Sequence, residues 1–467
     1  MPDVVVVGAG VMGASIALEL QRSGRSVLVV DRGDAVGAGS TSASSAVVRF
    51  NYSTLAGVIA AWESAHRWAD WAHHLGADQL EADSGSRPLA RFVRCPMLFI
   101  QSPGFNRDGS TAILSEVGVP WEVLDQDQLA EQFPALDTGR FYPPRRPDDP
   151  RFGDEPSGRL DAVRILDSGF IDDPQLAATN LMDAARRLGT EVQLGTEVVK
   201  VRHANGGTGH AGRHTVGIVT ADGREVDAPV VVNAAGPWSA GLNRLAGVFS
   251  GPDDGVAGNR PMRQEVHVVP APSGFTLDDG GVMIADLDLG YYSRPQVGDT
   301  LLVGGVEPDC DPLEWTDDPD AVSPHPTVDC FEAQVWRQAR RLPGLAVPHR
   351  PTGLAGVYDV TPDWVPIYDR TSLDGFYVAI GTSGNQFKNA PLVGQILRDI
   401  IDACEVGHDH DADPVSTRCD RIGRDLDLGA FSRLRSITET TGTVLGCLAK
   451  ARCCSGSSVG PSSTEFP

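Results

Sequence analysis

The stretch VVVVGAGVMGASIALELQRSGRSVLVVD, residues 4–31, decides the fold of this chain. Its four valines predict a buried strand, VMGASIALELQRSG has apolar residues at helical spacing, and SVLVVD predicts a second strand. Gly8, Gly10 and Gly13 form a G-x-G-x-x-G pattern between strand and helix, which permits a tight turn, a bound pyrophosphate and close helix packing. Asp31 ends the second strand, where a carboxylate accepts hydrogen bonds from a ribose hydroxyl. The unit predicts dinucleotide binding; the alternative is a glycine turn that binds nothing.

The composition is that of an acidic globular chain. It has 467 residues, 41 % hydrophobic and 22 % charged, and a formal net charge of −23. An acidic surface repels phosphate backbones, so no nucleic-acid partner is expected. No apolar stretch is long enough for a membrane span, and MPDVVVVGAG lacks the features of a secretory signal, so we expect a cytoplasmic location. The eight cysteines lack metal-ligand spacing, and no metal site is predicted.

Later segments return to the same architecture. AGVIAAWESAHRWADWAHHLG (56–76) predicts a helix with its tryptophans in the core. A helix from Pro174 and the apolar stretch APVVVNAAGPWSAGL (228–242) predict a return to a parallel sheet. Residues 259–305 alternate as short strands, which suggests an antiparallel layer facing the substrate. The Pro-rich and Arg-rich segment 141–160 predicts a surface loop; a lid over the site is the more specific, less favoured alternative.

Two polar segments favour FAD over a nicotinamide cofactor. In GAGSTSASSAVVR (37–49), Ser40, Thr41 and Ser42 offer hydroxyls for a ribityl chain and phosphates, which a nicotinamide enzyme does not need. The turn SGNQFKNAP (383–391) opens the last helix, where backbone N–H groups and the helix dipole stabilise the anionic pyrimidine side of a reduced flavin. We predict FAD, with a nicotinamide dehydrogenase as the alternative.

These segments predict a mixed fold class, α/β plus α+β. A Rossmann-like FAD-binding domain is interleaved with a substrate domain built on an antiparallel sheet. The predicted FAD-binding domain is discontinuous and comprises 1–85, 160–258 and 345–435. The predicted substrate domain comprises 86–159 and 259–344. Residues 436–467 are predicted to form a C-terminal tail whose Gly/Ser-rich end is disordered.

Several motifs resemble the D-amino-acid oxidase superfamily of FAD enzymes: GAGVMGASIALEL, VVNAAGPWS and TPDWVPIYD…GFYVAIGTSGNQFK. The resemblance spans roughly residues 3–445. Within it, GSTSASSAVVRFNY and LGAFSRLRSITETTGTVLG are most similar to sarcosine oxidase and dimethylglycine-oxidising relatives, including the beta subunit of the heterotetrameric sarcosine oxidase.

The resemblance implies a carboxylate clamp. Arg49 matches the arginine with which sarcosine oxidases hold the substrate carboxylate, and Lys388 matches the lysine beside it. Two cations over a flavin fix the carboxylate while a C–H bond points toward flavin N5; an ordinary ion pair is the alternative for each. Tyr292 occupies the stretch where relatives place substrate-contacting side chains. Either Tyr292 or His267 is a candidate to assist loss of the amine proton, although a strand histidine such as His267 is more often packed.

The resemblance and the motifs together imply a set of residues around FAD. Sheet and turn packing is the rival interpretation for Val198 and Trp238. The predicted set is Gly8, Ala9, Gly10, Val11, Met12, Gly13, Asp31, Arg32, Ser40, Thr41, Ser42, Ala46, Val198, Ala235, Gly236, Trp238, Gly356, Val357, Gly384, Asn385, Gln386, Phe387 and Lys388.

Two positions depart from the family pattern. The cysteine that tethers FAD in monomeric sarcosine oxidase falls at Gly356, and glycine forms no thioether, so a dissociable FAD is expected. The lysine that promotes oxygen reduction falls near Asp288, where a carboxylate repels superoxide-like charge. Oxygen is therefore expected to be a poor acceptor unless another cation activates it.

The sequence thus predicts an FAD-dependent oxidoreductase. It oxidises the C–N bond of a small amino acid or N-methylated amine and passes electrons to O₂ or another acceptor. A D-amino-acid dehydrogenase or oxidase is one alternative. A non-catalytic FAD-binding partner subunit is the other.

Overall fold

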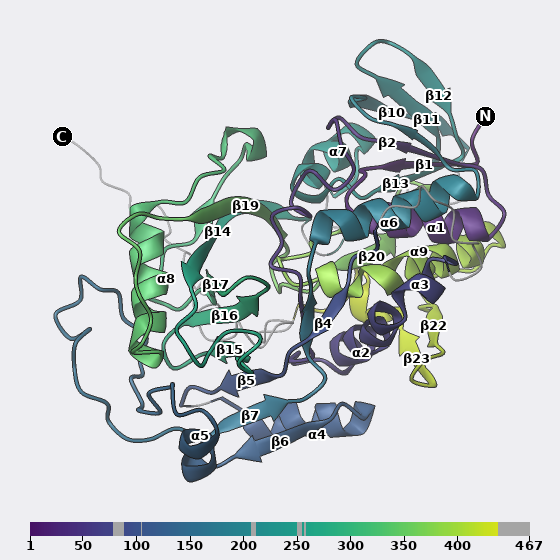
Figure 1. Cartoon of the computed structure of the whole chain (residues 1–467). Helices are drawn as coiled ribbons and strands as arrows, with labels where there is room; N and C mark the ends of the chain where they lie inside the picture. Colours follow the sequence, from purple (N-terminus) through teal and green to yellow (C-terminus); the bar gives the residue numbers. More distant parts are fainter. Residues whose placement is uncertain (78–87, 104, 207–211, 250–254, 256–257, 438–467) are drawn as a thin grey trace, which may run out of the picture.

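The computed structural model describes residues 1–77, 88–103, 105–206, 212–249, 255 and 258–437 (Figure 1). The predicted disordered end of the tail, with Cys447, Cys453 and Cys454, lies outside the described residues.

A six-stranded sheet forms the centre of one lobe. Its strand order is β20-β21-β13-β1-β2-β9, and all pairs are parallel except β20 with β21. The strands are β1 (Val4–Val7), β2 (Val27–Val30), β9 (Glu191–Gln193), β13 (Val230–Asn233), β20 (Ile367–Arg370) and β21 (Phe376–Ile380). The order places the N-terminal strand beside strands from the middle of the chain, so three remote segments share one sheet, as doubly wound folds do.

The two faces of this sheet carry different layers. Alternate valines of β1 and β2 pack against a helical layer on one face, and the others pack against a three-stranded sheet on the opposite face. The helices are α1 (Val11–Arg22), α6 (Pro174–Arg187) and α9 (Ala390–Glu405). The smaller sheet is β10 (Val198–Asn205), β11 (Arg213–Thr220) and β12 (Glu225–Asp227), beside α7 (Ser239–Ala246).

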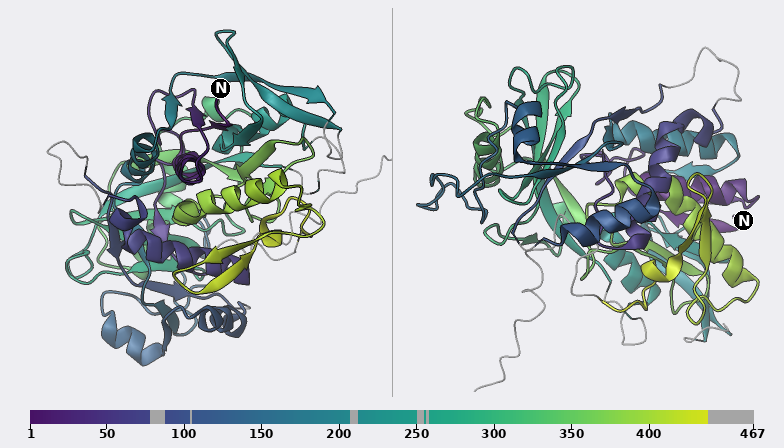
Figure 2. Two further views of the ribbon diagram at one scale, coloured as in Figure 1. Left: turned by 90° about the vertical axis from the view of Figure 1, so that its right-hand side faces the viewer. Right: turned by 90° about the horizontal axis from the view of Figure 1, so that it is seen from below.

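The second lobe is built on a nine-stranded sheet. Its order is β18-β14-β17-β16-β15-β5-β7-β6, with β19 also paired to β14. It is antiparallel except that β15 pairs in parallel with β5. Helix α8 (Val328–Arg341) covers its outer face, and Figure 2 shows this helix at the end of the molecule remote from the N-terminus. The strands are β5 (Met97–Ile100), β6 (Trp121–Leu124), β7 (Ala162–Ile165), β14 (Arg260–Pro270), β15 (Met283–Asp286), β16 (Tyr291–Gln296), β17 (Thr300–Gly305), β18 (Glu314–Trp315) and β19 (Gly353–Val360).

The predicted helix 56–76 is interrupted once. Helix α2 (Leu55–Ala69) ends before Asp70, and α3 (Trp71–His74) continues after it. Trp62, Trp68 and Trp71 are buried, so the core interpretation of these residues is confirmed. The other described elements are β3 (Val47–Val48), β4 (Phe92–Arg94), β8 (Gly169–Ile171), α4 (Arg107–Val117), α5 (Gln126–Gln132), β22 (Ser416–Cys419) and β23 (Arg424–Asp427).

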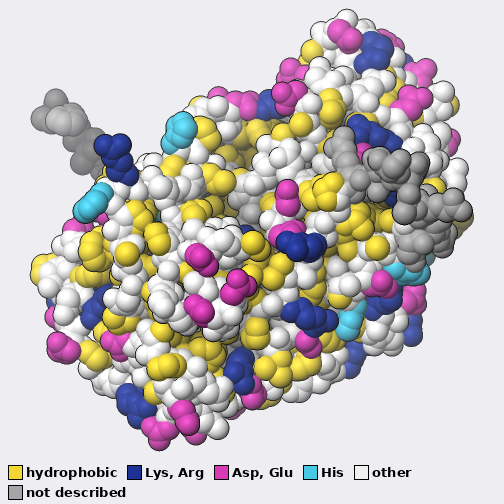
Figure 3. Space-filling model, viewed as in Figure 1, with side chains coloured by type: hydrophobic (Ala, Val, Ile, Leu, Met, Phe, Trp, Pro, Cys, Tyr) yellow, Lys and Arg dark blue, Asp and Glu magenta, His cyan; other side chains and the backbone are white. Residues whose placement is uncertain are grey.

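The surface mixes both signs of charge. On the face in Figure 3, Lys and Arg are interspersed with Asp and Glu rather than gathered into a single basic patch. Among the described residues, no helix combines the length and the apolar character that a membrane crossing requires.

Close backbone contact in the first turn makes alanine intolerable there. A Cβ on Gly13 would lie 1.9 Å from the carbonyl oxygen of Gly8. We expect Gly13→Ala to lower the free energy of unfolding by at least about 2 kcal/mol, because the helix must move off the strand. Gly153→Ala is the control, since a Cβ there meets nothing within 4 Å. Urea denaturation of both variants measures the difference, and equal stabilities would contradict this packing.

Candidate active site

A long cavity of about 700 Å³ runs from the first glycine turn to the second sheet. It begins at the carboxyl ends of β1 and β2, where open α/β sheets bind ligands. It continues along the polar run 37–45 and ends against β14, β19 and the turn before α9. The cavity therefore joins both lobes.

The end of this cavity beside the first glycine turn is shaped by Asp31. Its carboxylate accepts hydrogen bonds from the backbone N–H of Ala9 (2.6 Å) and of Gly33 (2.7 Å). The side chain thus ties the first turn to the end of β2. Thr41 accepts a hydrogen bond from the N–H of Val11 (3.1 Å), which fixes the polar run against the start of α1.

Most residues of the predicted FAD set line this cavity. The lining members are Gly8, Gly10, Val11, Met12, Asp31, Arg32, Ser40, Thr41, Val198, Ala235, Gly236, Trp238, Gly356, Val357, Gly384, Gln386 and Phe387. Asn385 and Lys388 line an adjoining space instead, and the other four, Ala9, Gly13, Ser42 and Ala46, line neither space. Gly13 packs beneath the turn, and the Ser42 hydroxyl donates instead to the carbonyl groups of Ala38 and Gly39. These four support the wall rather than face the cavity.

A smaller chamber of about 70 Å³ adjoins the long cavity. Arg49, Lys388 and Tyr292, the three predicted catalytic residues, all line it, as does Asn385. The structure therefore brings together side chains from β3's end, β16 and the turn before α9. Tyr292 and Phe387 line both spaces, so the chamber opens beside the end of the long cavity that lies against the second sheet.

Comparison with known proteins identifies the family. A family model described as FAD dependent oxidoreductase (DAO) matches residues 3–400. The chain belongs to this family of FAD-dependent oxidoreductases. It is 25 % identical over 436 residues to FAD-dependent oxidoreductase domain-containing protein 1 of Xenopus laevis, covering 85 % of this chain and 79 % of that protein.

Two further proteins extend the comparison. The 4-methylaminobutanoate oxidase (formaldehyde-forming) of Paenarthrobacter nicotinovorans is 26 % identical over 420 residues, which cover 87 % of this chain and 44 % of that protein. The crystal structure of L-proline dehydrogenase from P. horikoshii superposes with a TM-score of 0.69 at 21 % identity, covering 93 % of this chain and 97 % of that chain. The mixed α/β fold predicted from the sequence is confirmed by this likeness.

The long cavity of this FAD-dependent oxidoreductase fits its cofactor. Helix α1 begins at the cavity with Gly10 as N-cap, has no acidic residue in its first turn, and so presents its positive end to a diphosphate. Gly8 adopts φ +117°, and a Cβ there would lie 2.3 Å from the oxygen of Ala234, so the turn needs glycine. When bound, FAD supplies the hydride-accepting ring.

Burial makes Lys388 an unusual cation. Its ammonium donates to the hydroxyl of Tyr52 (3.0 Å) and to the carbonyl oxygen of Asn385. Trp68 donates to the carbonyl oxygen of Lys388 (2.7 Å) and stacks on Phe387, so α2 supports this turn from below. Burial, with a smaller contribution from the nearby Arg49, holds the pKa of Lys388 well below its usual range.

Arg49 is equally buried and held by its own segment. Its guanidinium donates to the carbonyl oxygen of Asn51 (2.6 Å) and lies 5.3 Å from the ring centre of Tyr52. Burial lowers the pKa of Arg49. Two basic side chains thus share one buried space, and an anionic ligand there favours the charged form of both.

The chamber also has lining residues that the sequence analysis did not single out, among them three with functional groups of interest. Tyr358, Trp364 and Glu307 line it beside the predicted residues. The ring of Tyr358 packs on Gly384, where a Cβ would lie 2.1 Å from the ring. The motif TPDW held the signal for Trp364, because the resemblance included it, but no sequence pattern distinguished Glu307.

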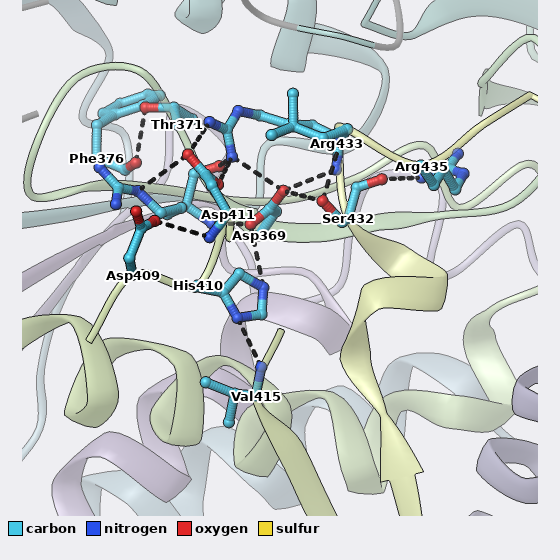
Figure 4. Close-up of polar contacts among 12 residues, drawn as sticks. Asp369, Thr371, Phe376, Asp409, His410, Asp411, Val415, Ser432, Arg433 and Arg435 are labelled. Carbon is cyan, nitrogen blue, oxygen red and sulfur yellow. Dashed lines mark hydrogen bonds and ion pairs between the residues drawn. The ribbon is translucent and has the colours of Figure 1, made fainter. Parts of the chain in front are cut away.

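The C-terminal segment 432–435 holds the loop that carries Trp364. Figure 4 shows Arg433 between Asp369 and Asp411, with its guanidinium 2.6 Å from both carboxylate oxygens of Asp411. Arg435 forms a fork with Asp363 (2.9 and 2.8 Å) and also donates to the carbonyl oxygens of Val365 and Pro366. Trp364 itself has φ +60°, which is strained for a non-glycine residue.

Two expectations about other side chains change with the structure. Asp288 lines neither space: it is fully buried and bonded to Arg341 (2.9 Å) and to the N–H groups of Phe141 and Tyr142. The expectation that Asp288 repels superoxide-like charge at the flavin is therefore wrong. His267 is packed, as its alternative interpretation held: it faces α8, lies 5.3 Å from the ring centre of Phe331, and burial lowers its pKa to about 4.

Behind the sheet, Glu265, His267 and Cys330 place possible metal-ligand atoms within 4.8 Å of one another. The Glu265 carboxylate already accepts hydrogen bonds from Arg263 (2.5 Å) and from the hydroxyl and backbone N–H of Thr327 (2.8 Å each). Because its oxygens are engaged by these donors, we assign no metal to this cluster.

Replacing Lys388 tests how its burial affects the pH dependence of stability. The pKa of Lys388 is lower in the folded protein than in the unfolded chain, so between that lower pKa and about 10.5 the unfolded chain binds more protons. The free energy of unfolding therefore rises with pH in this range. We expect Lys388→Met to be at least as stable as wild type at pH 7.5 and to lose this rise, which amounts to at most about 1.4 kcal/mol per pH unit. Denaturant unfolding of both proteins at pH 7.5 and 9.5 measures it. A parallel pH dependence in the two proteins would refute the assignment.

The Arg435 fork predicts a second variant. Arg435→Ala frees the loop at Trp364, and we expect KM for the amine to rise about tenfold while FAD stays bound. Arg435→Lys should recover little, because a lysine lacks the planar fork. Arg421→Ala is the matched control, since Arg421 forms a surface pair with Asp70. Steady-state kinetics test this. An unchanged KM in Arg435→Ala would show that Arg435 does not position the loop at Trp364.

Proposed function

We propose that this chain oxidises the C–N bond of a small amino acid. The leading substrates are secondary or N-methylated amino acids, and the product is an imine that hydrolyses. The observation that carries the proposal is the pairing of Arg49 and Lys388 in one buried chamber next to the long cavity. A buried guanidinium and a buried lysine whose protonation an incoming carboxylate favours suit a carboxylate-bearing amine, because the bound carboxylate fixes the position of the neighbouring C–H bond.

The compared proteins support this substrate class. The 4-methylaminobutanoate named for one relative is an N-methylated amino acid, and the L-proline named for one structure is a secondary amine. A sarcosine-oxidase-like reaction is the specific form of the proposal. Two alternatives are a D-amino-acid dehydrogenase or oxidase and a non-catalytic FAD-binding partner subunit. The bleaching screen distinguishes both from the proposed reaction.

The remaining parts of the proposal concern the cofactor and the chain. We propose that FAD is held without a covalent bond, because Gly356 lines the cavity and has no side chain to attach. The predicted division into an FAD-binding and a substrate domain, the role of the predicted site residues and a cytoplasmic location stay proposals. The electron acceptor is O₂ or another oxidant. Because Asp288 lies outside both spaces, its charge does not distinguish between these acceptors.

An anaerobic bleaching screen tests the function directly. Sarcosine, dimethylglycine, proline, pipecolate and D-amino acids are added to the oxidised holoenzyme, and loss of the flavin absorption is followed. We expect secondary or N-methylated amino acids to bleach the flavin fastest. A flavin that no amine bleaches would favour the non-catalytic partner subunit. Bleaching by D-amino acids alone would favour the D-amino-acid dehydrogenase or oxidase.

Arg49→Ala completes this test. Loss of a charge-assisted hydrogen bond is worth about 1.5–3 kcal/mol, so the substrate concentration for half-maximal bleaching should rise about tenfold to a hundredfold with FAD retained. Asn51→Ala keeps the guanidinium and is the control, because Arg49 bonds only the backbone carbonyl of that residue. An unchanged requirement for substrate in Arg49→Ala would show that the clamp is wrong.

A further inference from the structure

The chamber contains a negative charge as well as two cationic side chains. Among the described residues that line it, Glu307 alone carries a carboxylate. Glu307 follows β17 by two residues and is half-buried. Its charge acts on three neighbours: after burial, it adds to the rise in the pKa of Tyr292 and Tyr358, and it opposes the lowering that burial imposes on the pKa of Arg49. The carboxylate therefore acts within the space that the substrate is proposed to occupy.

The backbone at Glu307 adopts an unusual conformation. Glu307 has φ +49°, a left-handed conformation that non-glycine residues seldom adopt. Its neighbours Val306 and Pro308 are both buried. Strain of this kind persists only where the surroundings hold it, and it is concentrated at functional sites. The main chain at Glu307 is consequently held in position before any ligand arrives.

The charges in the chamber match a zwitterion. A carboxylate alone is served by Arg49 and Lys388, and an uncharged hydroxyl group on the same skeleton gives Glu307 no opposite charge. An ammonium group does, because opposite charges attract strongly in a site with little water. Resting on the proposed function, we propose that Glu307 binds the ammonium group of the substrate. The site thereby selects amino acids over hydroxy acids and plain carboxylates.

Charge-matched ligands test this without turnover. Trimethylammonioacetate and 3,3-dimethylbutanoate have the same shape and differ by one positive charge, and neither has a nitrogen lone pair from which oxidation can start. The pair 4-(trimethylammonio)butanoate and 5,5-dimethylhexanoate repeats the comparison with a longer spacing. Each is titrated into the oxidised holoenzyme, and binding is followed by the shift of the flavin absorption spectrum.

In the wild-type protein we expect the zwitterion to bind at least about tenfold more tightly than its uncharged-headed partner in one of the two pairs. The better pair reports how far the amine lies from the carboxylate. Glu307→Gln should bring the ratio close to one while FAD remains bound. Asp309→Asn is the matched control, because Asp309 is exposed two residues further on, and its ratio should equal that of wild type.

Three results would overturn the inference: no preference in wild type, no binding of either pair, or a preference that persists in Glu307→Gln. A rise in the affinity of both ligands in Glu307→Gln, with their ratio kept, would show instead that Glu307 only neutralises Arg49. The proposed function fails separately, when no amine bleaches the wild-type flavin even though the zwitterions bind selectively. Bleaching by amines with a ratio unaffected by Glu307→Gln leaves that function intact and removes this inference.

Discussion

The contact of helix α1 with its neighbours on both sides is the constraint on which the rest of the structure depends. Gly13 brings the helix against the turn at Gly8, and Gly394 brings α9 against the same helix, since a Cβ there would lie 2.2 Å from the carbonyl oxygen of Ser15. The Ser15 hydroxyl donates to the carbonyl oxygen of Ala390 and accepts from the N–H of Gly394 (3.1 Å). One helix therefore sets the distance between the first glycine turn and the turn that carries Lys388.

This arrangement lets a chain with a net charge of −23 keep positive side chains in its interior. Arg49 and Lys388 are bonded to backbone carbonyl groups near them, which reduces the cost of burying them, but within the part of the chain that the structure describes no carboxylate is bonded to Lys388. The stability given up in the chamber suits a binding site, where an incoming anion supplies the missing charge. Arg337 and Arg341, behind the second sheet, are instead paired with Asp311, Asp286 and Asp288.

Segments that close the chamber are fixed from outside it. The turn 387–389 rests on Trp68 of α2, and the loop at Trp364 is held by Arg435 near the end of the described chain. Asn385 also donates to the carbonyl oxygen of Trp364 (3.4 Å), a contact that links the two loops. Geometry at the reacting end thus depends on side chains that never touch a substrate, which is typical of preorganised sites.

The sequence by itself determined the dinucleotide turn, because a strand, three glycines and an acidic strand end act within 28 residues and need no distant partner. It also indicated Arg49, Lys388 and Tyr292 through the motifs that surround them. Only the tertiary structure decided that Asp288 and His267 face the back of the second sheet and that Glu307 faces the chamber. A one-residue change of register reverses the face of a strand residue, and the backbone at Glu307 follows no periodic pattern, so local sequence carries no information on where these three side chains point.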